Sequence, residues 1–129
     1  MQTYLWIGLG GALGSMARHW CNGLIAMTVG VAFPWGTLAI NVLGSIVIGI
    51  AAATMHDGGR FPASEDARAL LMVGICGGYT TFSAFSLQTL TLIQGGQWLP
   101  AVGNIALSVF LCIGGVWLGY LTGLALNTT

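Results

Sequence analysis

Apolar residues fill four long stretches of this chain, and short polar or glycine-containing segments separate them. The stretches cover residues 4–29, 36–55, 67–93 and 98–126. Each is long enough for a membrane-spanning helix, which needs about 20 mostly apolar residues. Their unbroken apolar character favours helices over a transmembrane barrel, whose strands alternate apolar and polar positions. The pattern predicts an all-α membrane protein with a single domain of four transmembrane helices, residues 1–129.

The third stretch contains a polar interruption at membrane depth. Gly77 and Gly78 are followed by Tyr-Thr-Thr-Phe-Ser-Ala-Phe-Ser at positions 79–86. Irregular backbone is tolerated at that depth only where protein buries it or an aqueous cavity meets it. We therefore expect the third helix to be broken here, beside a site for something polar.

The composition supports a membrane protein. Hydrophobic residues make up 56% of the chain and charged residues only 5%, and the mean hydropathy is +0.87. A soluble domain carries about 25% charged residues. We expect a multi-pass protein of the cell (inner or plasma) membrane, in contact with lipid. The chain has no basic surface for a nucleic acid.

The few charges are distributed almost evenly across the predicted membrane. Four spans place both termini and the 56–66 loop on one side, with Arg60 and Arg68. The other side has at most Arg18, if its side chain extends outward. Orientation follows the excess of Lys and Arg in short flanking loops. The small difference in arginine number between the two sides therefore favours one orientation only weakly. We infer that the chain inserts in both orientations, which would allow antiparallel pairs.

Small residues repeat on two of the predicted helices. Gly10 and Gly14 lie on the first, and Gly115, Gly119 and Gly123 on the fourth. Such faces let helix backbones approach closely. They predict close packing either within the chain or between copies of it.

Several polar side chains remain inside the predicted spans, and each has two interpretations. Arg18 could be a structural anchor or could attract an anion, because ionisable groups within a membrane are functional candidates. Asn41 could join two helices or present amide donors. Asn104, Ser108 and Cys112 recur every four residues on the fourth helix, which suits a packing seam or the wall of a polar track equally well.

Two phenylalanines follow the interruption. Phe82 and Phe85 are i, i+3 neighbours and project from one face of a helix. Hydroxyl and amide side chains surround them: Thr80, Thr81, Ser83, Ser86 and Gln88. Because the edge of a phenyl ring is positive, ring edges together with hydroxyls and amides can receive a small anion. The same two rings could also be ordinary core residues.

Other function classes fit the sequence less well. A small dual-topology, proton-coupled multidrug exporter is the main alternative, but it needs a titratable group at depth. The carboxylates Asp57, Glu65 and Asp66 all lie in the loop. A membrane hydrolase needs a base near its nucleophile, and His19 is the sole option within a span, so we do not expect an enzyme. A purely structural subunit would not explain the hydroxyl and phenyl pattern.

The segments just described resemble one known family. The decapeptide 77–86 is similar to the signature of the Fluc (CrcB) fluoride channels. Residues 35–38 and 41–44 resemble the second-helix motif of that family, and residues 10–14 with Arg18 resemble the first. The resemblance extends over essentially the whole chain, and the decapeptide is highly specific.

The resemblance implies a fluoride-selective channel that allows passive fluoride export from the cytoplasm. It also implies an antiparallel, dual-topology homodimer with two fluoride pathways. A structural sodium ion would lie at the dimer centre, held by the backbone carbonyls of Gly77 and Thr80. Arg18 would lie near a vestibule. The expected fluoride pathway consists of the positions that match the family's site residues and of polar residues near them: Asn41, Thr81, Phe82, Ser83, Phe85, Gln88, Asn104 and Ser108.

The chain departs from the family pattern at four positions. Gln88 stands where a glutamate is common, so a protonation-dependent role is not expected there. Cys112 replaces a serine or threonine and is a weaker donor. Ala84 replaces a usual threonine, and Asn104 takes a position often held by another residue type. We expect conduction to persist at an altered rate.

Overall fold

A computed structural model describes residues 1–128, and every regular element in that range is helical. Three of the four helical rods are single helices: α1 (Gln2–Val29), α2 (Trp35–Thr54) and α6 (Trp98–Asn127). The third rod consists of consecutive segments: α3 (Glu65–Arg68), the π-helix Ala69–Cys76, α4 (Gly77–Tyr79) and α5 (Phe82–Gln94). The all-α prediction is confirmed, and the third rod is interrupted after α4.

Three of the rods are long and apolar enough to cross a membrane. They are Trp35–Thr54, Glu65–Gln94 and Trp98–Asn127. With 28 residues α1 is also long enough, but Arg18, His19 and Asn22 lower its hydropathy. The chain is therefore a multi-pass membrane protein, and the first span, residues 4–29, stays a prediction.

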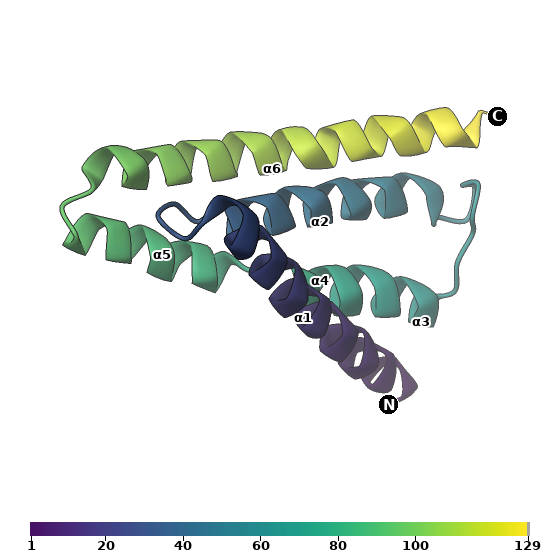
Figure 1. The fold of residues 1–129 in the computed structure, drawn as a ribbon. Helices are drawn as coiled ribbons and strands as arrows, with labels where there is room; N and C mark the ends of the chain where they lie inside the picture. Colours follow the sequence, from purple (N-terminus) through teal and green to yellow (C-terminus); the bar gives the residue numbers. More distant parts are fainter. Residues whose placement is uncertain (129) are drawn as a thin grey trace.

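The rods run back and forth along a common direction, except α1, which crosses the others obliquely (Figure 1). Both termini and the α2–α3 loop lie at one end, and the two short turns lie at the other (Figure 1). Two hydrogen bonds hold the first end together. The Thr3 hydroxyl donates to Asp66 Oδ1 at 2.7 Å, and the Arg60 N–H donates to Asn127 Oδ1 at 2.7 Å.

The small-residue faces pack within the chain. Side-chain carbons at Gly10 and Gly14 would collide with the backbone of the third rod, at Leu70 and Ile75 respectively. A side-chain carbon at Gly119 would overlap the Ile46 carbonyl of α2. These contacts account for the repeated glycines as intrachain packing, which brings α1 onto the third rod and α6 onto α2.

The break in the third rod lies three residues beyond the first glycine of the pair. Gly77 is helical, with φ −64 and ψ −37. Thr80 and Thr81 instead adopt extended conformations, with ψ values of 160 and 116. The second glycine serves close packing, because a side-chain carbon at Gly78 would lie 2.6 Å from the Gly11 carbonyl oxygen. The expected break is present, but it is made by the threonines.

Candidate functional site

Threonine side chains stabilise both edges of the break. The hydroxyl of Thr80 donates to the Cys76 carbonyl at 2.9 Å, and its N–H donates to the same oxygen at 3.0 Å. The hydroxyl of Thr81 accepts from the Ala84 N–H at 3.1 Å and so caps the start of α5. One threonine thus ends α4 and the next begins α5, which explains why two adjacent hydroxyl residues suit this position.

Asn41 of α2 holds the extended backbone between the two helices. Its Nδ2 donates to the Thr81 carbonyl at 3.0 Å, and its Oδ1 accepts from the Thr81 N–H at 2.7 Å. These bonds satisfy the backbone N–H and carbonyl of a residue that has left the helical pattern. Asn41 therefore joins α2 to the third rod, which is one of the two roles that the sequence allowed. An amide carries two hydrogens, and Thr81 uses one of them.

The same side-chain bonds release two backbone carbonyls. In an unbroken helix, the N–H groups of residues 81 and 84 would bond the carbonyls of Gly77 and Thr80. Here they donate to Asn41 and to the Thr81 hydroxyl instead. The Thr80 carbonyl accepts a long 3.5 Å bond from Arg18 Nη1. Gly77 and Thr80 are thus two of the four residues, 77–80, whose carbonyls lose the intrahelical donor at the break.

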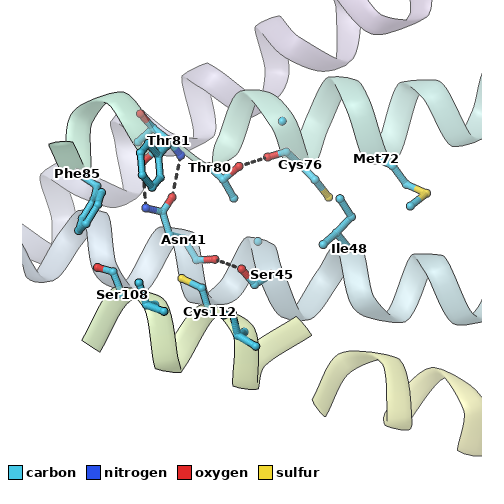
Figure 2. Close-up of a pocket in the computed structure, with 15 residues that line it drawn as sticks. Asn41, Ser45, Ile48, Met72, Cys76, Thr80, Thr81, Phe85, Ser108 and Cys112 are labelled. Atoms are coloured by element: carbon cyan, nitrogen blue, oxygen red, sulfur yellow. Dashed lines mark hydrogen bonds between the residues drawn. The ribbon is translucent and has the colours of Figure 1, made fainter. Parts of the chain in front are cut away.

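A cavity of about 400 Å³ lies between α2, the broken rod and α6. Asn41 and Ser45 of α2 line it, as do Phe85 of α5 and Ser108 and Cys112 of α6 (Figure 2). Thr80, Thr81 and Phe82 contribute from the break. We call this space the phenylalanine cavity. Its walls are mostly apolar, with hydroxyl and amide groups at a few points.

The two phenylalanine rings pack on each other at the edge of this cavity. Their centroids are 5.2 Å apart and their planes meet at 52°. Phe85 is 8% exposed, whereas Phe82 is 78% exposed. The chain itself therefore fixes the environment of Phe85 and leaves most of Phe82 uncovered.

A second cavity, of about 450 Å³, lies on the other side of the break. Arg18, His19 and Asn22 of α1 line it, and Ser83 and Gln88 of α5 face them. We call it the arginine cavity. Thr81 lines both cavities, so the break forms the wall between them. The predicted vestibule arginine and most of the polar residues after the break are brought together here.

Two expected pathway residues have distinct surroundings. Asn104 is 2% exposed and bonds to Thr89, and it lines neither of the two cavities. Gln88 lines the arginine cavity, and its Oε1 is buried without a hydrogen-bond partner within residues 1–128. Their roles on a fluoride pathway stay predictions.

The sequence interpretation overlooked several polar residues of the site. Thr89 follows Phe85 by one helical turn, and Asn22 follows Arg18 by one turn. The i, i+4 spacing could have marked both as lying on the faces of known candidates. Side-chain metal ligands do not gather anywhere in residues 1–128: no group of three His, Cys, Asp or Glu side chains is close enough to hold an ion.

The fold and the site define a class: an all-α, multi-pass membrane protein whose third membrane helix is broken between two cavities. A family model described as "CrcB-like protein, Camphor Resistance (CrcB)" matches residues 5–120. The chain belongs to this CrcB-like family.

Its relatives resemble it along nearly their whole length. A "Fluoride-specific ion channel FluC" of Rhodospirillum rubrum is 56% identical over 126 residues, which cover 98% of each chain. A protein of the same name from Methylocella silvestris is 52% identical, with 98% of this chain and 96% of the relative covered. One from Opitutus terrae is 48% identical, with coverage of 99% and 97%.

Proposed function

We propose that this chain is a fluoride-selective ion channel. The observation that carries the proposal is the helix break, where Asn41 holds Thr81, the residue that lines both the phenylalanine cavity and the arginine cavity. The relatives described above are named as fluoride-specific ion channels, which supports the same conclusion.

The chemistry of the two cavities suits a small anion. Fluoride holds its hydration water strongly, so entry requires compact donors that replace that water. Hydroxyl groups of Thr81, Ser83 and Ser108 and the free amide hydrogen of Asn41 can donate. The positive edges of Phe82 and Phe85 add attraction without a fixed charge. Mostly apolar walls between these points disfavour larger halides, which need more space and gain less from each donor.

Flow through such a path is passive and its direction follows the electrochemical gradient. A membrane potential contributes about 2.3 kcal/mol per elementary charge for each 100 mV. An inside-negative potential therefore drives a monovalent anion out of the cytoplasm. Conduction of this kind requires no titratable group in the membrane, and the carboxylates lie in the α2–α3 loop and at the start of α3: Asp57, Glu65 and Asp66.

The carbonyls of Gly77 and Thr80 fit a sodium ion. Hard cations prefer oxygen ligands, and these two oxygens are among those that lose their intrahelical donors at the break. A bound sodium ion would supply a fixed positive charge that offsets the cost of an anion at depth. Arg18 places its guanidinium 3.5 Å from the Thr80 oxygen, so a sodium ion bound there would share that oxygen with a second positive charge. The two charges repel each other, and an anion in this region would be attracted to both.

We propose that the channel is a homodimer of this chain. Phe82 belongs to the lining of the phenylalanine cavity but is 78% exposed. A partner subunit on this face would cover the ring and enclose the cavity. Because arginines barely favour one orientation, the two copies would be antiparallel, each with its own fluoride path. Two copies would also provide four carbonyls for the sodium ion.

Fluoride release from liposomes tests the proposed function. Purified protein is reconstituted into vesicles loaded with potassium fluoride, and a fluoride electrode records release after valinomycin is added. The proposal expects rapid, valinomycin-dependent fluoride release and little release of chloride from matched vesicles. Release that requires a proton gradient, with transport of organic cations, would identify the multidrug exporter instead. If neither fluoride nor organic cations are transported, the chain is a structural membrane subunit.

A further inference from the structure

Asn104 takes part in a buried chain of hydrogen bonds between two helices. Its Nδ2 on α6 donates to the Thr89 hydroxyl on α5 at 2.9 Å. That hydroxyl donates in turn to the Phe85 carbonyl, one turn earlier on α5, at 2.8 Å. The amide of one helix is thus connected through a single oxygen to the backbone of the residue whose ring lines the phenylalanine cavity.

The three residues connected by these hydrogen bonds are all protected from solvent. Asn104 is 2% exposed, Thr89 is 7% exposed and Phe85 is 8% exposed. Their neighbours along the helices, Leu92 and Ala101, are also buried. In such a low-dielectric environment a hydrogen bond is electrostatically strong, and a polar group left without its partner is costly. The link therefore constrains the relative position of α5 and α6 at this level.

The link lies at the end of the phenylalanine cavity. Ser108 lines the cavity from α6, and Asn104 precedes it by one turn on the same face. Phe85 lines the cavity from α5, and Thr89 follows it by one turn. The Asn104–Thr89 bond thus joins α5 to α6 one helical turn beyond the residues that line the cavity.

We propose that Asn104 and Thr89 are positioning residues: their hydrogen bond holds the Phe85 turn of α5 against α6 and so sets the width of the phenylalanine cavity. This inference rests on the proposed function, since the width matters through fluoride conduction. It assigns Asn104 a role through Thr89 and Phe85, rather than a contact with the ion.

Removing either partner tests the proposal. Thr89→Val keeps the shape of the side chain but removes the hydroxyl, and Asn104→Leu keeps most of the volume but removes the amide. We expect each variant to release fluoride about tenfold more slowly, because losing one buried hydrogen bond can lower the population of the conducting arrangement by about that factor. Chloride release relative to fluoride should rise in both, because a less constrained ring excludes larger ions less well.

Two further variants separate positioning from general damage. Thr89→Ser retains the hydroxyl and should keep most of the wild-type rate and selectivity. Thr122→Val is the matched control, because Thr122 on α6 is exposed and its hydroxyl makes the same local bond to the carbonyl four residues earlier, at 2.8 Å. This variant should conduct as the wild type does. The double variant of Thr89→Val and Asn104→Leu should be no slower than either single variant, since both remove the same bond.

Each remaining outcome overturns the proposal in a recognisable way. If Asn104→Leu is slow while Thr89→Val is normal, then Asn104 contacts the ion itself. If both conduct normally and the wild type conducts, then the link has no part in conduction. If the wild type releases no fluoride, then the proposed function has failed first. Should Thr89→Val fail to fold, Thr89→Ala against Thr89→Ser provides the same comparison.

Discussion

Asn41 on α2 forms a two-point pair with Thr81 in the helix break, donating to its carbonyl at 3.0 Å and accepting from its N–H at 2.7 Å. A side-chain amide here takes the place of the next turn of helix. The pair satisfies one residue of extended backbone and, by occupying the Thr81 N–H, releases the Gly77 carbonyl. One side chain therefore connects the stability of the break with the chemistry proposed for it.

Substitution of Asn41 should damage stability and conduction together. Asn41→Ala leaves the Thr81 N–H and carbonyl without partners, and each unsatisfied buried group costs about 1–3 kcal/mol. Asn41→Asp retains an acceptor for the N–H but has no donor for the carbonyl. Its loss of thermal stability should be at least as large, because an ionised carboxylate at membrane depth is costly and faces the Thr81 carbonyl, and its negative charge should abolish fluoride release. Thermal unfolding in detergent and liposome release measure the two effects, and a fully active Asn41→Asp would contradict the pathway role.

The two phenylalanines should respond differently to truncation. Phe85→Ile alters a ring that is 8% exposed, and Phe82→Ile alters one that is 78% exposed. Both should lose fluoride release, because both remove a positive ring edge from the cavity. Thermal unfolding in detergent should shift more for Phe85→Ile than for Phe82→Ile, because the chain itself buries only the Phe85 ring. Normal release in both variants would exclude the rings from the ion path.

Neutralising Arg18 should reduce conduction in a salt-dependent way. Arg18→Gln removes the positive charge from the arginine cavity, and screening weakens electrostatic attraction as ionic strength rises. The rate difference from wild type should therefore be largest at low ionic strength and diminish in concentrated salt. Arg60→Gln is the matched control, since Arg60 is exposed in the α2–α3 loop. Its bond to Asn127 uses the backbone N–H, which the substitution keeps. Equal effects of the two substitutions would point to net charge alone.

Sodium should stabilise the folded dimer if it binds at the freed carbonyls. A ligand that binds only the native state raises the free energy of unfolding in proportion to the logarithm of its concentration. We expect a higher Tm in sodium chloride than in choline chloride at equal ionic strength, with a rise that depends on sodium concentration. Identical melting in both salts would remove the sodium proposal and leave fluoride conduction untouched.

Two glycines of α6 should differ sharply when changed to alanine. A side-chain carbon at Gly119 would overlap the Ile46 backbone, whereas one at Gly114 meets no atom within 4 Å. Gly119→Ala should lower the free energy of unfolding by about 1–3 kcal/mol, the usual cost of overpacking. Gly114→Ala should be neutral or slightly stabilising, because alanine favours helix. Detergent unfolding curves measure both, and equal curves would mean that α2 and α6 can separate without cost.

Sequence patterns predicted the elements of the site well. The polar interruption predicted a break, and the i, i+3 spacing placed Phe82 and Phe85 together, where their rings are in contact. The spacing could not decide that the threonines, rather than Gly77 and Gly78, would make the break. A glycine suits both a bend and a close helix contact, and only the position of α1 over Gly78 shows that close packing applies here.

The sequence alone determined that this is an all-α membrane protein, because hydropathy and the need to satisfy every backbone group in lipid leave few alternatives. It also identified side chains that carry hydrogen-bond donors for an anion, since the donor groups of a side chain do not depend on the fold. Only the tertiary structure decided which partners they have: Asn41 pairs with Thr81 across 40 residues of sequence, and Asn104 pairs with Thr89 and lines neither the phenylalanine cavity nor the arginine cavity. Such partnerships follow from the way helices cross, which local periodicity does not specify.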